Sequence, residues 1–375
     1  MHAVVDPHPA ARIAHMWLHD FRCFTEVDLE LPAGLTVLHG ANGQGKSSLL
    51  EAIAWVARTR SFRGVADAML VRAGTEQAVL RAEVVAGDRR QLFEAEIRAA
   101  GRNRILCNRQ PVARARDLHG LLRVSVFSPD DLALVKGGPA DRRTYLDELL
   151  VSLAPRYDAA QTDFERVLKQ RNALLRNGVH DDEARATLDV FDDQFVAAAS
   201  EIVRGRMRLI DRLVPVIERD YHALAGATTE ISGSYETDWA DESLDIDEGL
   251  RAALEARRRA EIERGVTLVG PHRDEWRLSI AGLDARHQAS QGEQRTLALA
   301  LRLAGHAIVE ELAGTAPVLL LDDVFSELDA ERAAALVRNL PNGQTLLTTA
   351  GSVPSDVVPE QHLRIHDGRV EGEAA

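Results

Sequence analysis

The stretch Gly40-Ala41-Asn42-Gly43-Gln44-Gly45-Lys46-Ser47 decides the fold of this chain. It follows an apolar segment, residues 35–38, and precedes a helix-forming one, residues 49–54, so a strand, a glycine-rich turn and a helix follow one another. Glycines let the backbone take positive φ and turn its N–H groups toward a polyphosphate at the N-terminus of the helix. The pattern predicts a P-loop that binds ATP or GTP.

Two side chains of the P-loop carry specific expectations. Lys46 is expected to reach the β and γ phosphates, and the Ser47 hydroxyl to complete the coordination shell of a magnesium ion. The alternative, a chance glycine-rich turn, is disfavoured because the flanking strand and helix agree with the motif. The predicted nucleotide-binding residues are Gly40, Ala41, Asn42, Gly43, Gln44, Gly45, Lys46, Ser47 and Ser48.

Composition limits the class of protein. The chain has 375 residues, 45% of them hydrophobic, which is enough for two domains or for one domain with an insertion. The two cysteines, Cys23 and Cys107, are far apart and have no histidines at ligand spacing, so neither a disulfide framework nor a zinc site is indicated. The first fifteen residues do not resemble a signal peptide, and no apolar run reaches eighteen residues. We therefore expect a cytoplasmic protein with no membrane partner.

The net charge of −13 argues against a surface that binds nucleic acid everywhere. Any DNA contact has to come from local basic patches. One candidate is the segment 81–123, where ten arginines stand against five acidic residues, and another is the trio Arg58, Arg60 and Arg63. Solvated charged faces are the alternative explanation for both.

The chain is predicted to be an α/β protein with an inserted helical lobe. Residues 1–11 contain two prolines and are expected to form a flexible extension. Residues 12–129 and 263–375 carry the strand patterns and are expected to form one nucleotide-binding lobe. Residues 130–262 show helical periodicity, including a heptad-like run from Phe195 to Leu213 that Pro215 is expected to end, and are predicted to form the helical lobe.

A second motif is predicted to complete the nucleotide site. Residues 318–321 are all apolar and end in Asp322 and Asp323, as a Walker B strand does. Buried strands often end in aspartate, but a P-loop in the same chain favours the Walker B interpretation. Asp322 is expected to hold the magnesium shell, and Asp323 to orient and deprotonate the attacking water. Asp323 and Lys46 are the predicted catalytic residues.

The segment Ser290-Gln291-Gly292-Glu293-Gln294 precedes a helical pattern. Ser290 and Glu293 have the spacing of a capping box, which is a structural role. The same helix start offers N–H donors and a positive dipole end to a phosphate. Because the P-loop holds its own phosphates, we expect Ser290, Gly292 and Gln294 to bind the ATP of another copy of the chain.

These motifs, with Ser326-Glu327-Leu328-Asp329 after the Walker B strand, resemble those of ABC-type ATPases of the SMC/Rad50 group. The chain is also similar, from about residue 12 onward, to the RecF family of bacterial DNA replication and repair proteins. The resemblance implies an ABC-type P-loop ATPase head with an inserted, mainly helical second lobe. Beyond the two nucleotide motifs, the segments that carry it are 60–63, 127–132, 168–172 and 269–274.

The resemblance also implies a function. It implies an ATPase that forms a homodimer with ATP and Mg²⁺ and binds single-stranded, duplex or gapped DNA. The implied roles are recombinational gap repair, replication-fork recovery and SOS induction, with RecR and RecO as partners. For Arg273 it leaves three contacts open, namely nucleotide, DNA or the dimer partner.

The chain departs from the ABC pattern at three positions. No glutamine occurs in residues 121–131, Thr348 and Thr349 stand where a switch histidine is usual, and Asp323 is one methylene shorter than the common glutamate. We therefore expect a weak, DNA-stimulated ATPase that acts as a switch. Two alternatives remain, the ATPase subunit of a transporter and a scaffold that binds ATP only for structure.

Overall fold

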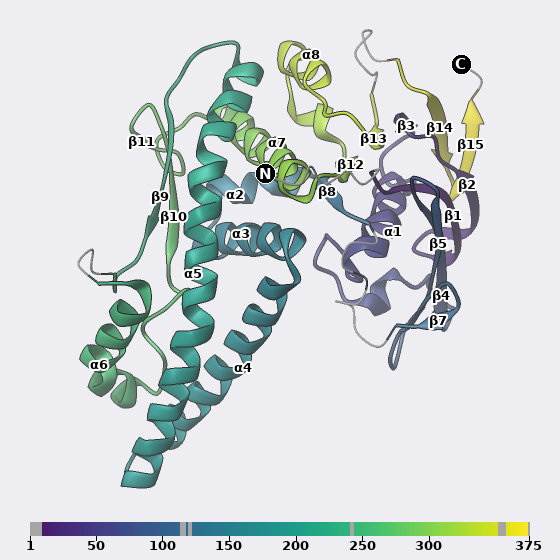
Figure 1. The fold of residues 1–375 in the computed structure, drawn as a ribbon. Helices are drawn as coiled ribbons and strands as arrows, with labels where there is room; N and C mark the ends of the chain where they lie inside the picture. The colour runs from purple at the N-terminus through teal and green to yellow at the C-terminus, as the bar shows by residue number, and fades with distance from the viewer. Residues whose placement is uncertain (1–9, 113–117, 119–121, 241–243, 352–357, 374–375) are drawn as a thin grey trace, which may run out of the picture. The chain divides into compact units, whose positions relative to one another are not determined.

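The computed structural model describes residues 10–112, 118, 122–240, 244–351 and 358–373 (Figure 1). The chain divides into two compact units. Unit 1 contains the described residues of Met1–Asp131, Asp220–Ala227 and Leu299–Ala375, and unit 2 those of Leu132–Arg219 and Thr228–Ala298.

Unit 1 contains a mainly parallel sheet that carries both nucleotide motifs. The strand order is β15-β14-β3-β13-β12-β8, and all neighbours are parallel except β14 and β15. Because the carboxyl ends of parallel strands meet at one edge, the sequence motifs after β3 and β12 lie at the same edge. The strands are β3 (Leu35–His39), β8 (Val124–Phe127), β12 (Val318–Leu321), β13 (Thr345–Thr349), β14 (Gln361–His366) and β15 (Arg369–Glu373).

A second, antiparallel sheet of unit 1 has the order β2-β1-β4-β5-β6-β7. Gly87 and Gly101 lie in the turns that separate its strands β4, β5 and β6. The strands of this sheet are β1 (Arg12–Phe21), β2 (Phe24–Glu30), β4 (Gln77–Ala86), β5 (Arg89–Arg98), β6 (Arg104–Cys107) and β7 (Gln110–Pro111).

The helix that follows the P-loop, α1 (Lys46–Arg58), contacts strands of both sheets. Its residues 49–56 are buried without interruption, as expected for a helix covered on all sides. The largest hydrophobic core of the chain joins α1 to the inner faces of both sheets. The P-loop is therefore anchored by a helix that cannot move without disturbing this core.

Unit 2 is mainly helical and contains a small sheet of order β11-β10-β9. Figure 1 shows α4 running alongside α5, and their side chains share a core with α6. The elements are α2 (Ala133–Lys136), α3 (Pro139–Leu153), α4 (Pro155–Asn177), α5 (Asp182–Ala225), β9 (Ile231–Glu236), α6 (Ile246–Arg264), β10 (Glu275–Ile280) and β11 (Leu283–Asp284).

The remaining elements are one long helix, one short helix and three single turns. The helix α7 (Gln291–Ala313) begins in unit 2 and continues into unit 1. The others, all in unit 1 except the last residue of η3, are η1 (Asp67–Leu70), η3 (Pro129–Leu132), η4 (Val324–Glu327) and α8 (Ala330–Arg338).

One local prediction is wrong. Pro215 does not end its helix, because α5 continues through it to Ala225. A proline inside a helix removes one backbone hydrogen bond and costs about 3 kcal/mol, which packing can offset. Ile217, Tyr221 and Leu224 remain on the buried side after the proline and supply that packing.

The units also differ in extent from the predicted lobes. Residues 263–298, which the sequence placed with the nucleotide-binding lobe, group with unit 2. The physical reason is that β10 pairs with β9 along its whole length, from Glu275↔Glu236 to Ile280↔Ile231. Of the extension expected over residues 1–11, all but residues 10 and 11 lie outside the described residues.

A buried amide joins the two sheets of unit 1. Gln344, which is 5% exposed, accepts a hydrogen bond from Ile13 N (2.8 Å) and donates to Ile13 O (2.7 Å) and Pro32 O (2.8 Å). Gln344 lies just before β13, whereas Ile13 belongs to β1. The side chain thus holds the antiparallel sheet to the parallel one.

We predict that Gln344→Leu lowers the free energy of unfolding by about 3 kcal/mol, because it leaves buried backbone groups without partners. The matched control is Gln361→Leu, which removes hydrogen bonds to Thr36 Oγ1 and Glu30 O at less buried positions and should cost less than about 1 kcal/mol. Urea unfolding of both variants measures the difference. Equal losses would show that Gln344 has no special part in joining the sheets.

Candidate nucleotide-binding site

The P-loop begins directly after β3 and requires glycine at two positions. Gly40 has φ 154° and Gly45 has φ 112°, both in the region that favours glycine. A Cβ atom at Gly40 would lie 2.2 Å from Ile365 O, and one at Gly45 would lie 2.5 Å from Cys23 Sγ. Backbone conformation and close packing therefore both exclude larger residues from these positions.

Two turns from other strands hold the loop in place. Asp367 N, in the turn between β14 and β15, donates a 2.6 Å hydrogen bond to the Gln44 side-chain oxygen. The thiol of Cys23, in the turn between β1 and β2, lies 3.8 Å from Gln44 O. Residues 41–43 stay exposed. Contacts from these two turns thus hold the loop at Gln44, while the backbone of residues 41–43 remains accessible.

Lys46 lies over the loop as a phosphate-binding lysine should. Its side chain is mostly buried, and Nζ donates to Gly40 O (2.7 Å) and Ala41 O (2.9 Å). Burial lowers the pKa of Lys46, while the carboxylates of Asp323 and Asp322 act in the opposite direction. The first turn of α1 carries no acidic residue that would oppose an anion at the helix start. These features fit a triphosphate.

Ser47 and Asp322 meet across the edge of the parallel sheet. Ser47 Oγ donates a 2.7 Å hydrogen bond to Asp322 Oδ1, and Thr348 Oγ1 donates a 2.8 Å bond to the same oxygen. Burial raises the pKa of Asp322, whereas the bonds from Ser47 and Thr348 and the charge of Arg63 lower it. A hydroxyl beside a carboxylate is an oxygen pair that suits Mg²⁺, whose remaining ligands are usually waters and phosphate oxygens.

Asp323 follows in a strained backbone conformation, with φ 48°. Its N–H donates a 2.8 Å hydrogen bond to Thr348 Oγ1, and its C=O accepts one from Ser326 Oγ (2.8 Å). Thr348 therefore connects both carboxylate residues. From the sequence, Thr348 is recognisable only as the residue in place of a switch histidine. The signal for its role is a hydroxyl near the carboxyl end of β13, the strand between β3 and β12.

The three arginines predicted to contact DNA lie in different surroundings. Arg58 is half-buried and its Nη2 is 3.5 Å from Val124 O, whereas Arg60 and Arg63 are exposed. The charge of Arg63 lowers the pKa of Asp322, so Arg63 lies within electrostatic reach of the nucleotide motifs.

A buried carboxylate supports the segment that carries these arginines. Glu51 of α1 is fully buried and accepts hydrogen bonds from Arg22 Nε (2.8 Å), Arg22 Nη2 (2.9 Å) and Ser61 Oγ. Ser61 Oγ in turn accepts a hydrogen bond from Arg63 N (3.0 Å). The helix that follows the P-loop thereby also fixes the backbone at Arg63.

In the segment 81–123, acidic neighbours offset much of the positive charge. Arg114 and Arg116 lie outside the described residues. Four of the described arginines form ion pairs, namely Arg81 with Glu94, Arg90 with Glu83, and Arg98 and Arg104 with Glu96. The count of arginines in the sequence therefore overstates the positive potential of this sheet.

The predicted signature segment lies in unit 2 at the start of α7. Ser290 N donates to Glu293 Oε2 (2.7 Å) and Glu293 N donates to Ser290 Oγ (3.3 Å), which confirms the capping box. Ser290 is exposed and Gly292 half-buried. Gln294 is buried, and its Nε2 donates to Ala285 O and Arg286 O, each at 3.0 Å. The side chain of Gln294 therefore braces the turn before α7.

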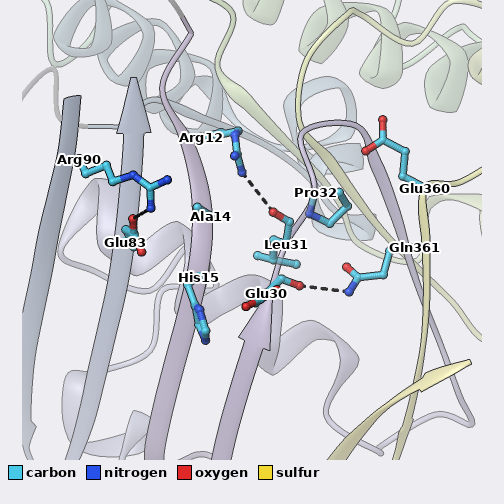
Figure 2. Close-up of a pocket in the computed structure, with 10 residues that line it drawn as sticks. All are labelled: Arg12, Ala14, His15, Glu30, Leu31, Pro32, Glu83, Arg90, Glu360 and Gln361. Carbon is cyan, nitrogen blue, oxygen red and sulfur yellow. Dashed lines mark hydrogen bonds and ion pairs between the residues drawn. The ribbon is translucent and has the colours of Figure 1, made fainter. Parts of the chain in front are cut away.

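A hollow of about 450 Å³ occurs elsewhere in unit 1 (Figure 2). Its lining mixes both charges, and the interactions drawn in Figure 2 already engage Arg90 with Glu83, Arg12 with Leu31 O and Gln361 with Glu30 O. None of the predicted nucleotide-binding residues lines it.

Comparison with known proteins agrees with this geometry. The family model described as RecF/RecN/SMC N terminal domain matches residues 12–350. A DNA replication and repair protein RecF of Frankia alni is 45% identical over 93% of this chain and 95% of its own length. The chain belongs to the RecF family. A RecF protein of Acidothermus cellulolyticus is 41% identical over 96% of this chain and 98% of its own length.

Solved structures place the fold in the same family. A structure described as the recombination mediator protein RecF-ATP in the RecFOR pathway has a TM-score of 0.90 and 29% identity, covering all of both chains. Smc head domains, such as that of Pyrococcus furiosus at 15% identity and a TM-score of 0.57, share the fold alone. The predicted ABC-type ATPase fold of a RecF family member is therefore confirmed. Among the described residues, no helix is long and apolar enough to span a membrane.

We predict that Asp322→Asn raises the thermal midpoint of the nucleotide-free chain at neutral pH. Burial raises the pKa of Asp322, so its ionised form destabilises the folded state. This gain should shrink as the pH falls toward 3.8, the ordinary pKa of aspartate, because the native carboxyl then takes up a proton.

The same variant should lose the additional stabilisation that ATP gives when Mg²⁺ is present, measured as the shift in thermal midpoint. Ligand at a hundred times its Kd stabilises by about 2.7 kcal/mol. Asp323→Asn is the control and should keep the shift. A variant Asp322→Asn that keeps it would remove Asp322 from the predicted metal site.

Proposed function

We propose that this chain is an ATP-dependent DNA-binding protein of recombinational gap repair, in which ATP brings two copies together in the DNA-binding state. The observation that carries the proposal is the 2.7 Å pairing of Ser47 with Asp322 beside the buried Lys46. Membership in the RecF family supports it, because related structures are described as ATP complexes in the RecFOR pathway. That family membership also argues against the transporter alternative.

Each residue of the nucleotide site has a proposed task. The backbone of residues 40–48 and Lys46 bind the phosphates, and Ser47 and Asp322 hold Mg²⁺, which neutralises charge on the β and γ phosphates when bound. Asp323 orients the attacking water and accepts its proton. Thr348 positions both carboxylates through its hydroxyl.

The signature segment is proposed to act on the ATP of the other copy. Ser290 caps the long helix α7 and is exposed, so its hydroxyl and the free N–H groups of the helix start can bind a phosphate. Gly292 contributes its backbone to this proposed phosphate site. Gln294 stabilises the turn before α7 through its hydrogen bonds to Ala285 O and Arg286 O. A head-to-tail pair would enclose two ATP molecules.

Hydrolysis is proposed to be weak and to act as a release step stimulated by DNA. Asp323 is a short carboxylate, and its backbone position is set by Thr348 in place of a histidine. Replication-fork recovery, SOS induction and contact with RecR and RecO are proposed on family membership. Arg63 is within reach of Asp322, so a role in neutralising the triphosphate is proposed beside the predicted DNA contact of Arg58, Arg60 and Arg63.

A mixing experiment tests the shared site. We predict that Lys46→Met and Ser290→Arg each abolish ATP hydrolysis alone, whereas their equimolar mixture recovers about a quarter of the native rate per chain. Random pairing makes half of the dimers mixed, and each mixed dimer has one site with an intact P-loop and an intact signature. No recovery above the sum of the separate variants would contradict the shared site.

A second experiment tests the switch. In the presence of ATP, Lys46→Met should lower the affinity for DNA at least tenfold, because it removes the charge that binds the phosphates. The affinity is measured by fluorescence anisotropy with a gapped duplex. Basal binding without ATP is the internal control and should stay unchanged. Full ATP stimulation of DNA binding in the variant would show that this stimulation does not depend on the P-loop lysine.

A further inference from the structure

The segment 265–274 of unit 2 is held by a network of buried polar groups. Arg171 of α4 is fully buried and donates to Asp192 Oδ1 (2.7 Å), Glu261 Oε2 (2.7 Å) and Thr267 Oγ1 (2.9 Å). Asn172 Oδ1 accepts hydrogen bonds from Thr267 N (2.7 Å) and Thr267 Oγ1 (2.8 Å). The start of the segment is thus fixed to α4.

The end of the segment is fixed in the same manner. Pro271 O accepts a 2.7 Å hydrogen bond from the buried Arg206, and Asp274 O accepts one of 2.9 Å from Arg143. The Asp274 carboxylate accepts hydrogen bonds from Tyr235 Oη (2.7 Å) and Trp239 Nε1 (2.8 Å). A segment without regular structure is therefore held by hydrogen bonds at both of its ends. Rigid support of this kind is what a binding surface needs.

Arg273 is the exposed residue of this segment and lies next to its end. Its Nε donates to Thr267 O (3.0 Å), a contact in which the two terminal nitrogens of the guanidinium take no part. The neighbouring His272 has its pKa lowered to about 4, first by burial and further by the charges of Arg273, Arg143 and Arg171. Three arginine side chains therefore lie within electrostatic reach of His272.

Lys169 and Arg176, two exposed cations of α4, form a strip of positive charge together with Arg273. They flank Asn172 at helical spacing, so all three lie on the face of α4 that meets the segment. Gly265 lies against Arg176, since a Cβ there would be 3.3 Å from Arg176 Cγ. Lys169 and Arg176 are about 10.5 Å apart along the helix axis, which spans roughly three phosphate steps of a DNA strand.

On α4, Lys169 and Arg176 differ from Arg156, Arg166 and Arg171, each of which pairs with a carboxylate. Within the described part of the chain, no acidic group lies at ion-pair distance from Lys169, Arg176 or Arg273. Acidic residues near these positions in the sequence are Glu165, one helical turn before Lys169, and Glu263 and Glu275, which pair with Arg259 and Arg142. Four exposed arginines of α4 and α6 are paired, namely Arg166 with Asp163, Arg251 with Asp193, Arg257 with Asp238 and Arg259 with Glu263, whereas Arg264 at the end of α6 has no ion pair among the described residues.

The composition of the strip favours nucleic acid over protein as its ligand. Stable protein interfaces have an apolar centre, and none of the described large hydrophobic residues that are exposed lies in 164–176 or 264–274. A row of unpaired cations on a chain of net charge −13 is instead what phosphodiester binding requires.

We propose that the strip formed by Lys169, Arg176 and Arg273 binds the phosphate backbone of DNA. This inference rests on the proposed DNA-binding function and assigns a contact surface in unit 2, separate from Arg58, Arg60 and Arg63. Arg171, Asn172 and Arg143 position the strip without contacting the ligand.

The test compares two triple variants of the full chain with ATP and Mg²⁺ present. Lys169→Gln/Arg176→Gln/Arg273→Gln removes the strip, and Arg166→Gln/Arg251→Gln/Arg259→Gln removes the same charge from ion-paired positions. Binding of gapped duplex DNA is measured over a salt series. The strip variant should bind at least tenfold more weakly, and its slope of log K against log salt should fall by about two to three, because each phosphate contact contributes about 0.9. The control should keep the native slope.

A footprint on the native chain gives an answer independent of folding. The chain has only three lysines, at 46, 136 and 169, so labelling with an amine-reactive reagent reports on single sites. DNA should protect Lys169 at least fivefold and leave the exposed Lys136 unchanged.

Each other outcome has a defined meaning. Equal losses in both triple variants, or an unprotected Lys169, would overturn the strip. Native DNA binding by the strip variant, with loss of binding to polyglutamate, would assign the strip to an acidic polypeptide and also overturn it. If binding depends on the strip but not on ATP, the strip stands and the proposed ATP switch fails. If ATP-stimulated binding is native in the strip variant, the switch stands and the strip fails.

Discussion

The contact of Ser47, Thr348 and Asp322 is the constraint on which the nucleotide site depends. Thr348 lies near the end of β13 and Asp322 directly follows β12, whereas Ser47 lies in the first turn of α1, after the P-loop. Their hydroxyl and carboxylate groups meet within 2.8 Å. Placing a buried carboxylate there is costly, as its raised pKa indicates. The cost is sustained because α1 and the two sheets form one core around the site. Stability elsewhere in unit 1 therefore supports a site that is itself unfavourable without a ligand.

Unit 2 uses buried charge differently. Arg171 and Glu261 are both fully buried and satisfied by each other, by Asp192 and by the backbone of the segment that follows α6. Such a network contributes little net stability compared with apolar packing, but loss of one partner is costly. Its effect is to give a loop one conformation. In both units, then, buried polar groups fix the position of chain segments that carry exposed functional groups.

Much of the nucleotide site could be predicted from the sequence, because its motifs depend on local patterns. The P-loop glycines, the apolar strand before Asp322 and the Ser290–Glu293 capping box each lie within a few residues. Contacts between distant residues could not be predicted in this way. The role of Thr348, the amide of Gln344 and the network of Arg171 each depend on residues far apart in the chain. The continuation of α5 past Pro215 likewise depends on tertiary packing, which overrides local propensity.

The central claim is that the triphosphate bound by Lys46, Ser47 and Asp322 also joins two copies of the chain. Its most direct test is the solution mass of the variant Asp323→Asn, which is expected to block hydrolysis, measured by light scattering with saturating ATP and Mg²⁺. The account predicts twice the 41.1 kDa mass of one chain with ATP, and the single mass without it. A mass of one chain under both conditions would contradict the account.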